Sequence, residues 1–284
     1  GVASLTCLPK TAWPPTYYAN MKADVSERQR VKLLADMIGY YRLCCPRIGG
    51  FKLFHLLEKN LGHAVTLGRD SFLKVYESKG FKLNPNKRRR TTDSNHVYKR
   101  YPNLIKGKDA RYSNHIWVSD ITYVWILGDV LYLHLVTDAY SHAVLGWCLS
   151  DSLSASHTTE ALRMAIRIAG GGNLCGTIHH SDRGSQYASE AYVSCLMEHH
   201  IRISMTEGYE PTDNAMAERQ NGIFKVEWIY EQEMYRDKEQ AINEINRMID
   251  FYNNRRPHMS IGMECPMEVY KGKLPGKNLW RKRP

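Results

Sequence analysis

The stretch IWVSDITYVWI, at residues 116–126, decides the fold of this chain. Its apolar residues form an almost unbroken run that predicts a buried strand, yet Asp120 stands in the middle of that run. A core strand does not carry a free carboxylate without a partner, because burying an unpaired charge is costly. We therefore take Asp120 as the first candidate functional residue.

The segments after this stretch predict a mixed sheet covered by helices, which is an α/β fold. VLYLHLVTD (130–138) follows a turn at Gly128-Asp129, and with HAVLGWCLS (142–150) it suggests an antiparallel meander. Helices are predicted at 156–169, 189–200, 213–230 and 238–254, and short strands at 176–180 and 201–205. Strands followed by alternating helices and strands are typical of a mixed sheet flanked by helices.

Two further acidic residues, with Asp120, have the spacing of a known kind of metal site. Asp182, in TIHHSDRGSQY, lies just beyond the fourth predicted strand, and Glu218, in PTDNAMAERQNGIFK, lies in a long helix whose expected N-cap is Asp213. Between Asp182 and Glu218 lie 35 residues. Hard oxygen ligands in such a cluster suit Mg²⁺ or Mn²⁺. Two such ions, roughly 3.5 to 4 Å apart, can activate an attacking oxygen and stabilise a leaving one, so the spacing predicts a two-metal phosphoryl-transfer site.

The charge of the chain is divided unevenly along its length. The formal net charge is +10, yet residues 1–110 carry 21 basic against 8 acidic residues, while residues 111–284 carry 18 against 21. The last fourteen residues, 271–284, form a basic tail with six basic and no acidic residues. Basic arms on an acidic module are the pattern expected when the arms bind a polyanion and the module binds divalent cations.

The N-terminal part predicts a small all-α domain. After an N-terminal segment at 1–25, helices are expected from Ser26, as N-cap, over 26–37, over 50–60 and over 67–80, with Gly80 ending the third. Three short helices with a basic surface suggest a helix-turn-helix-like DNA-binding domain at 26–83. A plain helical bundle with solvated Lys and Arg is the alternative.

A basic linker is predicted at 84–110. Its cluster of Lys87, Arg88, Arg89 and Arg90 could follow DNA phosphates with little base selectivity, or could be part of a solvated connector.

The remaining composition excludes several classes of protein. Seven cysteines without a CxxC pair predict reduced thiols in a cytoplasmic chain, and no zinc site is expected, since the pairs at 179–180 and 199–200 lack partners that would complete a tetrahedral histidine set. No apolar run reaches the roughly 18 residues of a membrane span, and the first residues do not resemble a secretory signal. No membrane partner is expected.

Four blocks of this sequence, in order, resemble a known family. WVSDITYV, HSDRGSQY, DNAMAERQNGIFKVE and FYNNRRPHMSIGMECPMEVY are similar to the signature blocks of bacterial insertion-sequence transposases of the IS-three family. These share the ribonuclease-H-like DDE core with retroviral integrases, and the resemblance covers about residues 26–270. It implies that Asp120, Asp182 and Glu218 are the catalytic, metal-binding triad, and that Lys225, two helical turns after Glu218, contacts transposon-end DNA.

The resemblance also implies an activity and its partners. The core at 111–270 would be a DNA transposase that hydrolyses a phosphodiester at the element's end and then joins the freed 3′-hydroxyl to another phosphate, using Mg²⁺ or Mn²⁺. The partners would be double-stranded DNA, as terminal inverted repeats and target, a second copy in a homodimer or larger assembly, and the product of an upstream reading frame. The expected location is the bacterial nucleoid.

Several secondary candidates have two interpretations each. Arg183 and Gln186, beside Asp182, could contact DNA or cap a loop, and Asn221, one turn after Glu218, could contact DNA or be solvated on the helix surface. Arg255 and Arg256 could contact phosphates or hold the tail against the core.

One further acid and two other functions remain as alternatives. Asp138, at the end of the second strand, could bind metal or stabilise a turn, and the turn role is favoured. The whole chain could instead be a DNA-binding regulator with an idle catalytic fold, although three converging acids are not needed for binding. It could also be a ribonuclease-H-like nuclease without strand transfer.

Overall fold

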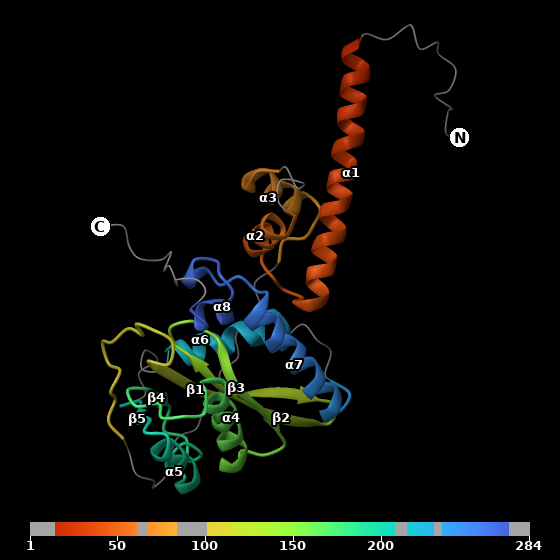
Figure 1. Cartoon of the computed structure of the whole chain (residues 1–284). Coiled ribbons are helices and arrows are strands. Elements are labelled where there is room, and N and C mark those ends of the chain that lie inside the picture. Colours follow the sequence, from red (N-terminus) through yellow and green to blue (C-terminus); the bar gives the residue numbers. More distant parts are fainter. Residues whose placement is uncertain (1–14, 62–66, 84–100, 208–214, 230–234, 273–284) are drawn as a thin grey trace.

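The centre of the fold is one mixed sheet of five strands in the order β3-β2-β1-β4-β5 (Figure 1). The first three strands pair antiparallel as a meander, whereas β4 and β5 run parallel to β1. The strands are β1 (Ile116–Ile126), β2 (Asp129–Asp138), β3 (Val144–Ser150), β4 (Ile178–Ser181) and β5 (Arg202–Met205). The predicted meander and mixed sheet are confirmed. The computed structural model describes residues 15–61, 67–83, 101–207, 215–229 and 235–272.

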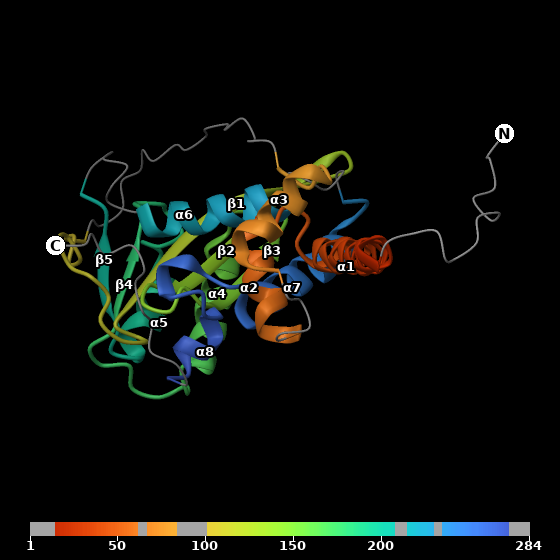
Figure 2. The same ribbon diagram turned by 90° about the horizontal axis from the view of Figure 1, so that it is seen from above.

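Helices cover both faces of this sheet, and together they make a ribonuclease-H-like fold. One face packs against α4 (Ala155–Ile168) and α5 (Glu190–Glu198). The other face packs against α6 (Ala215–Phe224), the π-helix η3 (Lys225–Ile229) and α7 (Lys238–Asn254), and Figure 2 shows α6 lying along it. The prediction of α7 is confirmed to the residue, whereas the end of the helix expected over 213–230 changes to a π-helix.

Two glycines show why these residues form these elements. Gly128, at the tip of the β1–β2 hairpin, has a φ of +83°, a left-handed conformation that glycine adopts without steric cost, so the predicted turn is confirmed. Gly146 in β3 lies so close to α4 that a Cβ built on it would lie 1.9 Å from the carbonyl oxygen of Ala161. The strand and the helix therefore pack backbone to backbone, which fixes α4 on this face.

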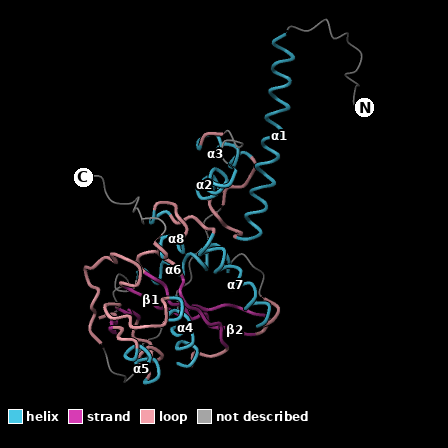
Figure 3. Tube along the Cα trace, viewed as in Figure 1, coloured by secondary structure: helices cyan, strands magenta, loops and turns pink. Residues whose placement is uncertain are grey.

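The helical region at the N-terminus stands above the sheet, as the trace in Figure 3 shows. It consists of α1 (Pro15–Cys44), α2 (Gly50–Leu61) and α3 (Arg69–Ser78). The second helix is as predicted to within one residue, and the third is two residues shorter at each end than the predicted 67–80. The first begins at Pro15, so the prediction that Ser26 is its N-cap is wrong: Ser26 lies inside the helix, because residues 16–25 contain no proline or glycine to interrupt it.

A single hydrophobic cluster joins the helical region to the sheet. Its members include Leu34 and Leu57 from the helical region, Leu133 from β2, Trp228 from η3 and Tyr252 from α7. The helical region is therefore packed onto the same core as one face of the sheet.

The chain continues past α7 through the short helices η4 (Met259–Ile261) and α8 (Pro266–Tyr270), which the sequence patterns did not indicate. Among the described helices, none is both long and apolar enough to cross a membrane.

Candidate active site

The register of β1 and β4 brings two of the three candidate acids together. The strands are parallel, and Val118 lies opposite His180. Continuing this register by two residues places Asp120 level with Asp182, the first residue beyond β4. Electrostatics agree, because Asp182 is among the groups that raise the pKa of Asp120. A strand position and a strand end thus bring the two carboxylates to the same edge of the site.

Asp120 is held in an environment that opposes its charge. Burial and then the nearby Asp182 raise the pKa of Asp120 to about 7, against weaker opposing effects. Those effects are the hydrogen bonds donated by the backbone N–H of Ile121, at 2.9 Å, and by the side-chain amide of Asn221, at 2.5 Å, and the charge of Lys225. A cation bound beside Asp120 would therefore stabilise its ionised form.

The loop after β4 wraps around the second acid. The backbone N–H of Gly184 donates to Oδ1 of Asp182 at 2.9 Å. A Cβ on Gly184 would lie 3.0 Å from that same oxygen and 2.8 Å from Oε1 of Gln186, so the close approach favours glycine here. Tyr187 lies buried beside both acids, which raise its pKa after burial itself does, and its hydroxyl has no hydrogen-bond partner among the described residues.

The helix α6 crosses β1 and supplies the third side of the site. Asn221 is only 4% exposed, and while its amide N–H donates to Asp120, its Oδ1 has no partner in the described part of the chain. The prediction of a solvated helix surface for Asn221 is wrong because the side chain is buried against Asp120, and its DNA contact stays a prediction. Glu218 lies in α6 one turn before Asn221, but its side chain, like all of Asp213, lies outside the described residues.

Lys225 is the first residue of η3 and is half-buried. Its positive charge favours the ionised form of Asp120, so it lies on the same side of the helix as the acids. This places a cation near enough to act on Asp120, whereas the prediction that Lys225 shares a helix face with Glu218 stays a prediction, because the Glu218 side chain lies outside the described residues.

These side chains fit a hard divalent cation. Two adjacent carboxylates, one of them with a raised pKa, would be stabilised by a bound ion, and the unsatisfied oxygens of Asn221 and Tyr187 add polar groups that accept or donate near it. Oxygen donors of this kind are those that Mg²⁺ and Mn²⁺ prefer.

A second possible ligand set lies elsewhere. Cys148 on β3 and His157 and Glu160 on α4 have ligand atoms within 4.8 Å of one another. The thiol of Cys148 donates to Glu160 at 3.4 Å, and burial together with Glu160 raises its pKa to about 12. Since the protonated thiol and the carboxylate satisfy each other, this group does not indicate a metal centre.

The histidine pair in the middle of β4 has structural partners. Nε2 of His179 lies 2.7 Å from Oγ of Ser119 and 2.8 Å from the hydroxyl of Tyr192, and Nδ1 of His180 lies 2.8 Å from Oγ of Ser204.

Several of the other predicted DNA contacts lie away from Asn221 and Lys225. Arg183 donates to the backbone carbonyls of Thr206, at 2.7 Å, and Glu207, which is the geometry of the loop-capping alternative. Gln186 is half-buried over Gly184, and Arg255 is exposed, so a DNA contact for these two stays a prediction. The basic residues of the linker lie outside the described residues: Lys87, Arg88, Arg89 and Arg90.

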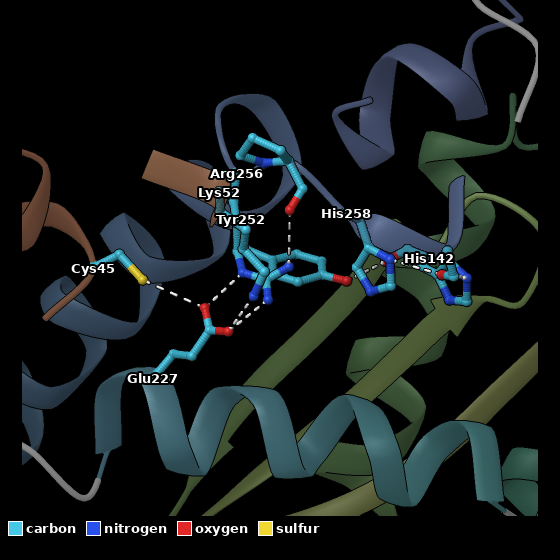
Figure 4. Close-up of polar contacts among 9 residues, drawn as sticks. Cys45, Lys52, His142, Glu227, Tyr252, Arg256 and His258 are labelled. Atoms are coloured by element: carbon cyan, nitrogen blue, oxygen red, sulfur yellow. Dashed lines mark hydrogen bonds and ion pairs between the residues drawn. The ribbon is translucent and has the colours of Figure 1, made fainter. Parts of the chain in front are cut away.

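The predicted DNA contact of Arg256 is wrong. Its side chain is 1% exposed and makes two hydrogen bonds to Glu227, at 2.7 and 2.6 Å (Figure 4). Glu227 itself was missed, because 28 residues lie between the two partners and no local pattern links them.

Asp138 has the structural role that was favoured. Its carboxylate is fully buried and accepts hydrogen bonds from the backbone N–H and hydroxyl of Ser141 and from the backbone N–H of Asn114. It stabilises the turn after β2.

Comparison with known proteins places this site in a family context. Two domain models described as integrase core domain match residues 110–211 and 199–266. A putative transposase for insertion sequence element IS986/IS6110 of Mycobacterium tuberculosis (strain ATCC 25618 / H37Rv) is 34% identical over 187 residues, which cover 64% of this chain and 67% of that protein. An insertion element IS600 uncharacterized 31 kDa protein of Shigella sonnei is 30% identical, with 72% and 75% covered.

Among solved structures, the catalytic core domain of HTLV-2 integrase in complex with magnesium is 21% identical, with 56% of this chain and 97% of that chain covered and a TM-score of 0.43. The fold assignment rests on the strand order and the helices described above, since this likeness is too distant to add to it.

Proposed function

This chain belongs to the insertion-sequence transposases that carry an integrase core, and from this we propose that it cleaves and joins DNA at a site built on Asp120, Asp182 and Glu218. The observation that carries the proposal is the parallel register of β1 and β4, which sets Asp120 beside Asp182. Asn221 binds α6 to Asp120 and so brings the helix that contains Glu218 over the same edge.

The three acids would hold two divalent ions, Mg²⁺ or Mn²⁺. When bound, such ions activate the attacking oxygen and stabilise the charge on the leaving oxygen of a phosphate. The raised pKa of Asp120 supports this role, because a carboxyl group that resists ionisation beside another carboxylate gains most from a nearby cation.

The chain's own residues would orient the acids and the DNA. The Asn221 amide holds Oδ2 of Asp120 while the Ile121 N–H holds Oδ1, so the carboxylate has one fixed orientation. The Gly184 N–H does the same for Asp182. We assign Lys225 to a phosphate of the element's end, because it supplies a cation beside the acids from the same helical stretch.

Two substitutions at phosphorus make up the proposed reaction. In the first, a water oxygen attacks the phosphorus at the element's end, the bond to the 3′-oxygen breaks, and that oxygen leaves as a 3′-hydroxyl. In the second, this hydroxyl attacks a target phosphate and loses its proton while another 3′-oxygen leaves. Both steps proceed without a covalent bond between protein and DNA, so no protein nucleophile is required.

Other parts of the chain would serve the DNA and the assembly. The excess of basic residues over residues 1–110 supports binding of duplex DNA there. Two element ends must be brought together, so we propose a homodimer or larger assembly on DNA, in the nucleoid, with the product of an upstream reading frame as a further partner. A nuclease without strand transfer, or a regulator with an idle site, is the competing function.

The decisive experiment incubates the protein with a labelled terminal-repeat duplex and Mg²⁺ and follows nicking and joining. Wild type should give a nick with a 3′-hydroxyl and then a joined product, and Asp120→Asn, Asp182→Asn and Glu218→Gln should give neither. Asp129→Asn, an exposed acid at the tip of the same hairpin, is the matched control and should behave as wild type.

Three outcomes would change the proposal. Joining that survives all three substitutions would remove catalysis from these acids. A nick without joining would support the nuclease instead. Binding of the duplex with neither nicking nor joining, under every metal tried, would support the regulator.

A further inference from the structure

The helix that contains the proposed site changes form directly after it. From Lys225 to Ile229 the chain adopts a π-helix, a rare conformation that occurs frequently at functional sites. Lys225 at its start lies on the side of the acids, whereas Glu227 and Trp228 contact the helical region. One short segment therefore lies between the proposed site and α1–α2.

Glu227 accepts hydrogen bonds from four donors contributed by different parts of the chain (Figure 4). Arg256, after α7, donates from Nε at 2.7 Å and from Nη2 at 2.6 Å. Lys52, on α2, donates from Nζ at 2.6 Å, and the thiol of Cys45, in the turn between α1 and α2, lies at 3.5 Å. Although burial by itself raises the pKa of Glu227, the charges and hydrogen bonds of Arg256 and Lys52 outweigh it and lower the pKa to about 2.

Further hydrogen bonds from residues 227 and 228 also join η3 to the turn between α1 and α2. Its carbonyl oxygen accepts from the backbone N–H of Arg47 at 3.2 Å, and the indole N–H of Trp228 donates to the carbonyl of Cys44 at 2.7 Å. Two consecutive residues of η3 are thus attached to the α1–α2 junction by main chain as well as by side chains. A shift of that junction would displace η3 with it.

Lys52 is not needed to balance the charge of Glu227, because Arg256 already does so. The two bonds from Arg256 already pair the carboxylate, and the pKa of Lys52 is lowered by burial and then by the charge of Arg256. Burying Lys52 as a second cation therefore costs stability, and this cost argues against a purely structural role for Lys52. It does add one thing that Arg256 cannot add, a bond between α2 and η3.

We propose that Lys52 is a positioning residue, whose bond to Glu227 makes the docking of α2 set the position of η3 and, through it, of Asn221 and Lys225 at the proposed site. The inference rests on the proposed function, since it assigns the helical region, which would hold duplex DNA, a direct influence on the acids. DNA that orders α1–α3 would in this way favour the cleavage-competent arrangement of α6.

The first test needs neither DNA nor activity. In the DNA-free full chain, Lys52→Met should raise amide hydrogen exchange over residues 221–229 by about tenfold, while β1–β3 remain unchanged. The matched control is Lys59→Met, because Lys59 also lies on α2 and joins Glu268 of α8 at 3.3 Å but is 45% exposed. Lys59→Met should leave exchange over 221–229 as in wild type, and Lys52→Arg should restore most of the protection.

A second test separates positioning from stability. At saturating terminal-repeat duplex and a temperature where all variants are folded, Lys52→Met should lower kcat about tenfold with KM unchanged, and Lys52→Arg should recover most of it. If Lys52→Met does not fold, Trp228→Phe removes the hydrogen bond to Cys44 together with part of the buried ring, and should raise exchange in the same window by a smaller factor.

The outcomes distinguish this inference from the proposed function. Unchanged exchange over 221–229 in Lys52→Met, or in Trp228→Phe when that variant replaces it, would overturn the coupling whether or not the protein cleaves DNA. Exchange that rises equally in the sheet would show a merely stabilising role and would also overturn it. If exchange rises only in 221–229 but wild type neither nicks nor joins DNA, the coupling stands and the proposed function fails.

Discussion

Half-buried Asp120 and buried Glu227 carry carboxylates on either side of one helical stretch, and their pKa values move in opposite directions. Burial opposes the charge of both. At Asp120 a second acid adds to the effect of burial and the pKa rises to about 7, whereas at Glu227 two cations outweigh burial and the pKa falls to about 2. Partners, rather than burial, decide the direction.

This difference distinguishes the acid site at Asp120, which we propose binds a ligand, from the junction at Glu227, where η3 meets α2 and the segment after α7. At the junction the carboxylate of Glu227 is paired within the chain, by Arg256 and Lys52, so Glu227 needs no other molecule as a partner. The acid site leaves charge unbalanced and two buried polar atoms without partners among the described residues, so it is completed by what binds there. Each prediction below acts on one member of this pair.

Asp120→Asn should have the largest effect on activity and the opposite effect on stability. Loss of a metal ligand should lower strand cleavage by about 10³-fold or more, since metal stabilisation of the transition state contributes several kcal/mol. In EDTA the variant should melt a few °C above wild type at pH 8. A carboxyl group with a raised pKa loses stability as pH rises from its unfolded pKa, about 3.9, through about 7, and the amide has no such loss.

Differential scanning calorimetry with Asp129→Asn as control would measure this stability effect. A melting temperature of Asp120→Asn at or below that of wild type in EDTA would mean that the acid site is not electrostatically strained, and the contrast with Glu227 would be lost.

Arg256→Met should destabilise the chain by about 3–5 kcal/mol, because it leaves Glu227 buried with part of its compensating charge removed. Urea unfolding would measure this loss. The triple variant Arg256→Met, Glu227→Met and Lys52→Met should recover most of the stability, since all three buried charges of the cluster are then gone. Equal losses in the single and triple variants would show that the fault lies in packing around Tyr252 and not in the charge.

The pH dependence of stability should show the junction directly. Because the pKa of Glu227 is lowered from 4.5 to about 2, its contribution is complete above the unfolded pKa and is lost as pH falls toward 2. The loss should amount to about 3 kcal/mol between pH 5 and pH 2 and should be absent from Glu227→Gln. Unfolding free energies from urea titrations at several pH values would test it, and parallel profiles for the two proteins would contradict it.

Asn221→Ala should have the smallest of these effects, a fall of about 10- to 100-fold in cleavage rate, in line with loss of one hydrogen bond to a charged group. Asn221→Asp should require less Mg²⁺ for half-maximal rate, because it adds a negative charge beside Asp120 and so strengthens the attraction for a divalent cation. Rates measured over a Mg²⁺ series would separate the two variants. Wild-type rates in both would show that the bond to Asp120 has no part in ordering the site.

Local patterns were enough to predict most of the elements of this chain. Apolar runs joined by turn residues indicated the meander, and α7 was predicted to the residue, because such runs and end signals are local. The predicted start of α1 was wrong. Serine can cap a helix, but it also lies inside a helix when no proline or glycine ends the helix upstream, as at Ser26.

Side-chain roles at long range were harder to predict. Asn221 was expected to contact DNA or be solvated, and Arg256 to contact phosphates or hold the tail against the core, yet neither buried acidic partner was anticipated. Their partners lie far away in the sequence, at Asp120 and Glu227, so no spacing within one element indicates the pair. Polarity alone does not say whether a side chain meets solvent or another charge.

The sequence by itself determined the strands and helices, the apolar run broken by Asp120, and the spacing of three acids that indicated phosphoryl transfer. Tertiary structure alone decided that β4 lies beside β1 with Asp182 level with Asp120, that Asn221 joins α6 to that edge, and that Glu227 ties η3 to α2. The physical reason is that the two kinds of interaction act over different distances along the chain. Helix and strand propensities act over a few residues, whereas charge balance at a buried site depends on groups that meet only when the sheet pairs and the helices pack.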